Sequence, residues 1–101
     1  TFNFWIGNGT DPNYATINST PSNVQALITV EKVNDISKMY RDGVLAGTLT
    51  DDYDSSGAVS FGQRNATGTA KYSEVIIYDS AQNNTIRTGI ETNINTFYSI
   101  Y

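Results

Sequence analysis

The chain contains neither cysteine nor histidine. Without cysteine it has no disulfide framework, no thiolate nucleophile and no cysteine zinc site. Without histidine it lacks the commonest general base and metal ligand. The usual acyl-transfer chemistry is therefore not expected from these residues, and we predict that the chain is not an enzyme.

Basic residues are also scarce. Six lysines and arginines stand against ten aspartates and glutamates in 101 residues, a net charge of −4. No basic stripe is present that could neutralise phosphates, so nucleic acid is not an expected partner, and an anionic membrane surface is disfavoured for the same reason. No run of apolar residues approaches 18 and no signal peptide opens the chain, so membrane insertion is not expected. The first residue is Thr1 rather than Met, which suggests a piece of a longer protein.

The chain is rich in Asn, Thr, Ile and Tyr, a composition that favours β-strands joined by Asn-rich turns. Apolar and polar residues alternate from Val24 to Val33, which predicts a half-buried strand with Val24, Ala26, Ile28 and Val30 on one face. Asp42-Gly43 predicts a type I′ hairpin. The sequence predicts strands at Phe2–Ile6, Tyr14–Ile17, Val24–Val33, Ile36–Arg41, Val44–Thr50, Ala58–Arg64 and Tyr72–Asp79.

Two segments near the C-terminus have other patterns. The nearly continuous apolar run of Val75, Ile76 and Ile77 predicts a strand that is covered on both faces. After residue 80 the period changes to that of an α-helix, with Asn83 or Asn84 as N-cap, Glu91 on the solvent face and Gly89 costing about 1 kcal/mol. The apolar stripe of this helix consists of Ile86, Ile90, Ile94, Phe97, Tyr98 and Tyr101.

Three ordered motifs suggest a family. KMYRDGVLAG at 38–47, VSFGQR at 59–64 and SEVIIYDSAQNNTIRTGIETNIN at 73–95 resemble the C-terminal half of laminin-G-like jelly-roll domains, in the concanavalin A-like lectin and glucanase superfamily. This resemblance, over residues 24–101, implies an all-β antiparallel β-sandwich with one C-terminal α-helix. Residues 1–101 would then be a single domain, or the C-terminal half of a larger sandwich that packs against a missing half-domain or another subunit.

The resemblance implies a non-catalytic recognition or adhesion module. Such a module would bind a glycan or a surface protein, on a bacterial surface protein or a phage virion, at an extracellular or virion surface. The alternative is a structural or decoration domain that acts through protein–protein contacts. A glycoside hydrolase would need a missing N-terminal half to supply its carboxylates, because Glu31, Glu74 and Glu91 do not have the spacing of a catalytic pair.

The candidate binding residues lie mainly in one polar loop. Tyr53 is flanked by Asp52 and Asp54, so its ring is expected to be exposed for stacking on a sugar while carboxylates and amides such as Asn65 bind hydroxyl groups. Trp5 is a further candidate, although its apolar surroundings favour a place in the core. We therefore predict a binding site that contains Tyr53, Asp52, Asp54, Asn65 and Trp5.

The same loop has part of a calcium-binding pattern. Asp52, Asp54, Ser56 and Gly57 follow the first half of a calcium loop, but Gln63 stands where a bidentate glutamate is needed. A solvated strand connection is the favoured interpretation, with calcium as the alternative. No cofactor or metal is predicted.

Overall fold

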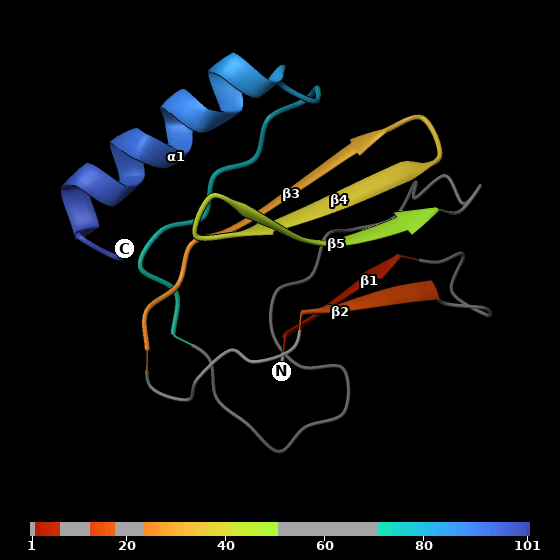
Figure 1. The fold of residues 1–101 in the computed structure, drawn as a ribbon, viewed down its shortest axis with the longest axis horizontal. Helices are drawn as coiled ribbons and strands as arrows, with labels where there is room; N and C mark the ends of the chain where they lie inside the picture. Colours follow the sequence, from red (N-terminus) through yellow and green to blue (C-terminus); the bar gives the residue numbers. More distant parts are fainter. Residues whose placement is uncertain (1, 7–12, 18–23, 51–70) are drawn as a thin grey trace.

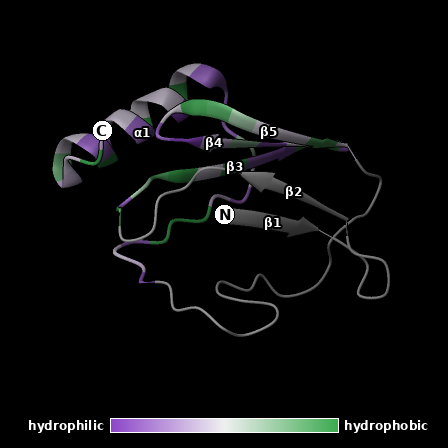
Figure 2. Ribbon diagram, turned by 60° about the horizontal axis from the view of Figure 1, so that its bottom comes forward, coloured by the Kyte–Doolittle hydropathy of each residue, from purple (hydrophilic) through white to green (hydrophobic). Residues whose placement is uncertain are grey.

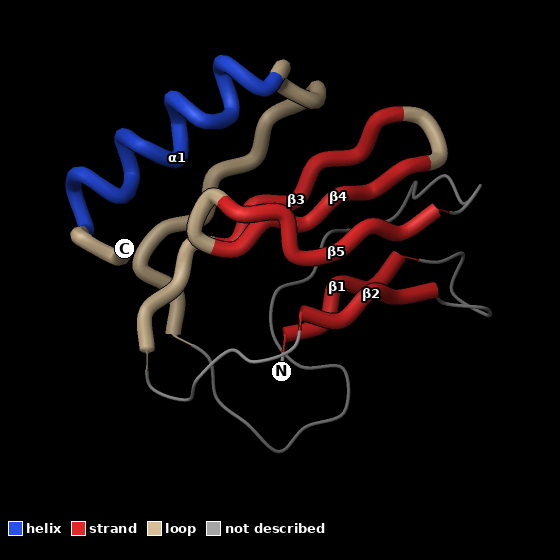
Figure 3. The backbone as a smooth tube through the Cα atoms, in the orientation of Figure 1, coloured by secondary structure: helices blue, strands red, loops and turns tan. Residues whose placement is uncertain are grey.

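The computed structural model describes residues 2–6, 13–17, 24–50 and 71–101. In these residues the chain forms five strands followed by one helix, and Figures 1 and 3 show how these elements are arranged. The elements are β1 (Phe2–Ile6), β2 (Asn13–Ile17), β3 (Ile28–Val33), β4 (Ile36–Arg41), β5 (Val44–Thr50) and α1 (Asn84–Tyr98).

The strands β3, β4 and β5 form an antiparallel meander in that order. Two short turns connect them, and both follow from local sequence. Asn34 adopts φ 53° in the first turn, and Asp42 and Gly43 adopt φ 52° and 79° in the second. Positive φ at both central positions is the type I′ geometry that Asp-Gly favours, so the predicted hairpin is confirmed. The bounds of β4 and β5 agree with the predicted strands Ile36–Arg41 and Val44–Thr50.

The strand predicted at Val24–Val33 begins four residues late, at Ile28. Its partner strand explains the difference, because Ile28 pairs with Arg41 and the chain then enters the Asp42 turn. The backbone of Leu27 bonds Asp42 instead, by Asp42 N to Leu27 O and by Leu27 N to Asp42 Oδ1, both at 2.9 Å. The prediction that Val24 and Val30 belong to a buried apolar face is also wrong, since both side chains are exposed.

Strands are confirmed at the predicted Phe2–Ile6 and, beginning one residue earlier than predicted, at Asn13–Ile17. The strands β1 and β2 pair antiparallel with each other. This pair lies next to β5, while α1 lies on the other side of the three-stranded sheet (Figures 1 and 2). In the described residues, a three-stranded antiparallel sheet and a C-terminal helix make a mixed α/β arrangement, and no sandwich or jelly roll is seen. The predicted strand Ala58–Arg64 lies outside the described residues.

The strand predicted at Tyr72–Asp79 is not formed. Every residue from 71 to 80 is exposed, including the apolar run Val75–Ile77 that was expected to be covered on both faces. A strand needs a neighbouring strand to bond its backbone, and none of the described strands pairs with this segment. A hydrogen bond between side chains, from Gln25 Nε2 to Ser73 Oγ at 3.3 Å, connects this segment to the residues before β3.

The helix α1 begins and ends at well-defined caps. Asn83 Oδ1 accepts a hydrogen bond from Ile86 N at 2.9 Å, which confirms Asn83 as the N-cap. At the other end, Ser99 adopts a left-handed conformation with φ 54° and ψ 53°, and its N–H donates to Asn95 O. Both ends therefore satisfy backbone groups that an uncapped helix would leave without partners.

The helix packs by a different face from the one predicted. Glu91 was expected in solvent, but it is 3% exposed and faces the sheet. Ile90, Ile94 and Tyr98 are half-buried beside it, whereas the remaining stripe residues, Ile86, Phe97 and Tyr101, are exposed. The buried face is rotated because Arg87 pairs with Glu91, so the two charges enter the interface together. Figure 2 shows hydrophilic and hydrophobic residues mixed along α1.

The described part of the chain has a small core. Its buried hydrophobic side chains are Met39, 1% exposed, and Tyr40, both on the central strand β4. Met39 lies against Gly47, the residue opposite it on β5, where a Cβ would stand 3.1 Å from the Met39 terminal carbon. Many large apolar side chains remain in contact with solvent.

Candidate functional site

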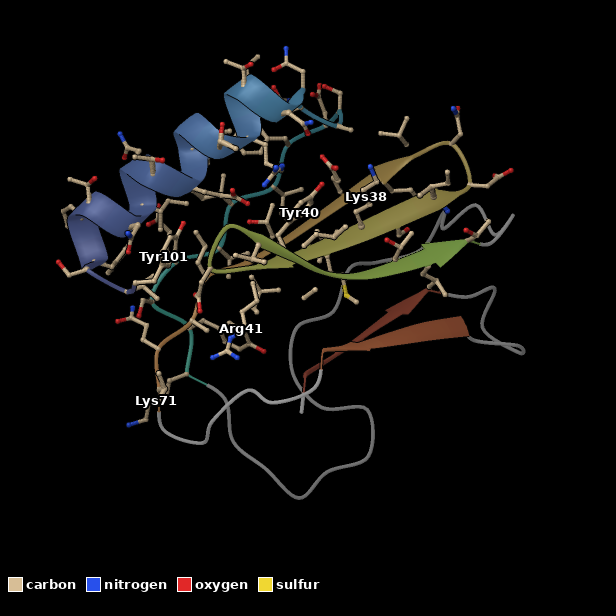
Figure 4. All side chains as sticks on the ribbon, viewed as in Figure 1. Lys38, Tyr40, Arg41, Lys71 and Tyr101 are labelled. Atoms are coloured by element: carbon tan, nitrogen blue, oxygen red, sulfur yellow. The ribbon has the colours of Figure 1, made fainter. Side chains whose placement is uncertain are left out.

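Tyr40 is the centre of a cluster between the sheet and α1, which also contains Glu31, Arg87, Glu91 and Tyr101. We call this group the Tyr40 cluster, and Figure 4 labels its two tyrosines, Tyr40 and Tyr101. Tyr40 lies on β4 opposite Thr29, and Glu31 lies two residues further along β3 on the same face. The Tyr40 hydroxyl donates a hydrogen bond to Glu31 Oε1 at 2.9 Å. Two neighbouring strands therefore fix the phenol ring.

Arg87 brings the helix to this ring. Its guanidinium carbon lies 3.7 Å from the centroid of the Tyr40 ring, and its Nη1 lies 2.7 Å from Glu91 Oε2. The Arg87 and Glu91 side chains are 11% and 4% exposed, so this pair is screened from water. A cation over an aromatic face contributes up to about 2 kcal/mol when desolvated. The interaction therefore fixes the helix on the sheet.

Tyr101 closes the cluster from the C-terminal tail. Asn95 holds the tail, because its Oδ1 accepts hydrogen bonds from Ile100 N and Tyr101 N, both at 2.8 Å. The Tyr101 hydroxyl thereby lies against Gly43, where a Cβ would stand 3.2 Å from it and 3.8 Å from Glu91 Oε2. The Asp-Gly turn, the helix and the tail meet at this point.

The tyrosines here resist ionisation. Burial raises the pKa of Tyr40 above its ordinary value, and the hydrogen bond to Glu31 raises it further. Burial and then the negative charge of Glu91 raise the pKa of Tyr101. Burial and then Glu74 raise the pKa of Tyr98. All three shifts favour the neutral phenol over the phenolate.

The polar and charged groups of the Tyr40 cluster interact with one another. Its cation is already paired, and Arg87 Nε and Glu91 Oε1 are buried with no hydrogen-bond partner. In residues 24–50 and 71–101 no group of three or more potential metal-ligating side chains is arranged to hold an ion. A buried pair between an arginine and a glutamate, stacked on a tyrosine, positions the helix and offers no free nucleophile.

A second feature is the exposed apolar segment from residue 72 to 78, which we call the 72–78 segment. It has no regular secondary structure and precedes α1 in the chain. Ile77 is 67% exposed, and Val75 and Ile76 are each about half exposed. The large exposed residues of this segment are Tyr72, Val75, Ile76, Ile77 and Tyr78.

The predicted binding loop cannot be placed in this site. Tyr53, Asp52, Asp54 and Asn65 lie outside the described residues, as do Ser56 and Gly57 of the calcium pattern. Trp5 lies in β1 with Tyr14 as its partner, and only its backbone is described. The binding role of these residues stays a prediction.

The three glutamates weighed as catalytic candidates do not form one group. Glu31 and Glu91 both enter the Tyr40 cluster, one from the sheet and one from the helix. Glu74 instead lies near Tyr98, whose pKa it helps to raise. Among the described residues no ion pair joins Glu74 to Lys71.

Sequence reasoning missed the Tyr40 cluster, although one signal was available. Arg87 and Glu91 are spaced i, i+4, which places opposite charges side by side on one helix face. That spacing predicts the pair but not its burial. The burial depends on Tyr40, 47 residues earlier in the chain.

Comparison of the chain with protein-family models, with curated proteins and with solved structures finds no match. Within the described residues, no helix is both long enough and apolar enough to cross a membrane.

Proposed function

We propose that the chain is a non-catalytic module that works through contact with another protein surface. The observation that carries the proposal is the 72–78 segment. Fully burying a side chain such as Val or Ile stabilises by about 1.5–3 kcal/mol, so exposing three in a row forgoes several kcal/mol that a partner would supply. Contiguous exposed apolar surface of this kind is typical of interaction sites.

The proposed partner surface is a β-sheet. The 72–78 segment is rich in β-branched and aromatic residues, and β3 is an edge strand of the three-stranded sheet. A sheet laid over it would bury the face that the segment turns toward that sheet and complete a jelly-roll sandwich. The second sheet would come from a longer form of the same polypeptide or from another subunit.

This proposal belongs to the structural alternative raised by the sequence, at an extracellular or virion surface. Glycan recognition by Tyr53 and its neighbours stays a second prediction, because the described residues contain no part of that loop. The two differ in which residues matter, since one depends on Ile77 and the other on Tyr53.

A site-specific photocrosslinker distinguishes them. Placed at position 77 in cells that make the protein, it should yield one discrete adduct whose crosslinks map to a β-strand of the partner. The same crosslinker at Thr88, an exposed position on α1, is the matched control. Equal labelling from both positions, together with glycan-array binding that Tyr53→Ala abolishes, would refute the protein-contact proposal.

A further inference from the structure

The outward face of α1 is unusual because it carries no charge. Surface helices normally present charged residues to water and apolar residues to the core. In α1 the charged residues are Arg87 and Glu91, and both face the sheet. The chain has a net charge of −4, so an uncharged helix face is a distinct patch on an acidic protein.

The uncharged face has the spacing of a helix-pairing seam. Its residues follow the three- and four-residue steps by which one helix packs along another, and all of them are exposed. We call this set the outer seam, and it consists of Ile86, Gly89, Asn93, Thr96 and Phe97. Phe97, at 79% exposed, is the most exposed large apolar residue of the described chain. Figure 1 shows no other described element on this side of α1.

The outer seam contains a projection and a matching hollow. Phe97 projects from it, and a shallow open hollow lies beside Phe97, lined also by Gly89, Thr92, Asn93 and Thr96. At Gly89 a Cβ would meet nothing within 4 Å, so the floor of the hollow is open. A side chain of a partner therefore has room to enter it.

The seam is complementary to itself. Phe97 lies four residues after Asn93 and Gly89 lies four residues before it. A twofold axis through Asn93 therefore places Phe97 of each copy over Gly89 of the other when the two helices run antiparallel. The two Asn93 amides then face each other, and each is able both to donate and to accept a hydrogen bond.

We propose that a second copy of this chain occupies the outer seam and forms an antiparallel helix pair about Asn93. Self-complementarity favours this occupant, and because the seam carries no charge, no like charges oppose each other across the contact. A polar Asn inside such a seam fixes the register of the pair. One helix of 15 residues is about 22 Å long, so the contact is small and the dimer is weak and depends on concentration.

Sedimentation velocity over a concentration series tests the proposal. Phe97→Ser should weaken association at least about tenfold, as loss of a central aromatic anchor does. Gly89→Leu should also weaken it at least about tenfold by filling the hollow, although leucine favours the helix more than glycine does. Thr88→Ser, at an exposed position of α1 outside the outer seam, is the matched control and should leave association unchanged. The crosslink from position 77 tests the 72–78 segment separately, so the two proposals fail independently.

A crosslinking experiment tests the symmetry. The chain has no cysteine, so Asn93→Cys introduces a single thiol on the proposed axis. With oxidised glutathione as the oxidant, two such thiols should form a disulfide-linked dimer, whereas Thr88→Cys should remain largely monomeric. A chain that stays monomeric up to about 1 mM, or equal crosslinking of the two variants, would overturn the proposal.

Discussion

Removing the charge of Arg87 tests what holds α1 on the sheet. Arg87→Met keeps most of the side-chain length but leaves Glu91, which is 3% exposed, without its cation. Breaking a buried pair in this way costs about 3–5 kcal/mol. A domain of this size is stable by about 5–15 kcal/mol in total, so the change should lower the urea midpoint strongly.

The double variant makes the reasoning sharper. Arg87→Met with Glu91→Leu replaces both charges by apolar groups of similar size, a change that is often neutral or stabilising by about 1–4 kcal/mol. The double variant should therefore be far more stable than Arg87→Met alone. Urea unfolding followed by far-UV circular dichroism, for wild type, both single variants and the double, gives the coupling free energy.

Two results would refute this account. One is a cost below about 1 kcal/mol for Arg87→Met, which is typical of an exposed ion pair. The other is additivity of the two single variants within about 0.5 kcal/mol, which is typical of residues that do not interact. Either result would mean that the pair is exposed to water in solution.

Three further predictions concern the helix, the turn and the pH dependence of stability. Gly89→Ala should stabilise the monomer by about 1 kcal/mol, because alanine favours the helix more than glycine does and the added methyl meets nothing within 4 Å. An unchanged or lower melting temperature would contradict this. Gly43→Ala should lower the free energy of unfolding by about 1–2 kcal/mol or more, since the φ of Gly43 is 79° and the new Cβ would stand 3.2 Å from the Tyr101 hydroxyl. A urea midpoint equal to that of wild type would be inconsistent with this turn geometry. Burial and the hydrogen bond to Glu31 raise the pKa of Tyr40 in the folded state. As the pH rises, the Tyr40 phenol therefore loses its proton in the unfolded chain first, and stability should fall above about pH 10. Tyr40→Phe should make that alkaline fall shallower, and an identical slope in urea titrations would show that Tyr40 does not contribute to it.

The elements predicted from local patterns agree with the structure wherever nearby residues provide the partners. The Asp42-Gly43 hairpin needs only two residues that tolerate positive φ, and the strands on either side have the predicted bounds. The N-cap at Asn83 depends on a side chain and a backbone N–H three residues apart. Such features depend on short stretches of chain, so they can be read from the sequence.

The predictions that failed concern partners distant in sequence. The Tyr72–Asp79 run has strand composition, but a strand forms only where another backbone bonds it, and in the described residues none does. The late start of β3 depends on where its partner reaches the Asp42 turn. The candidate binding loop around Tyr53 lies outside the described residues, so its prediction stands untested.

The sequence alone determined that a helix follows residue 83, that hairpins precede it and that charge is sparse and mostly negative. It did not determine which side of the helix turns inward. Helical periodicity favoured the isoleucine stripe, yet Arg87 and Glu91 are buried, because the Tyr40 ring accepts the guanidinium and the carboxylate neutralises it. That choice depends on three side chains from two elements meeting in space, and only the tertiary structure brings them together.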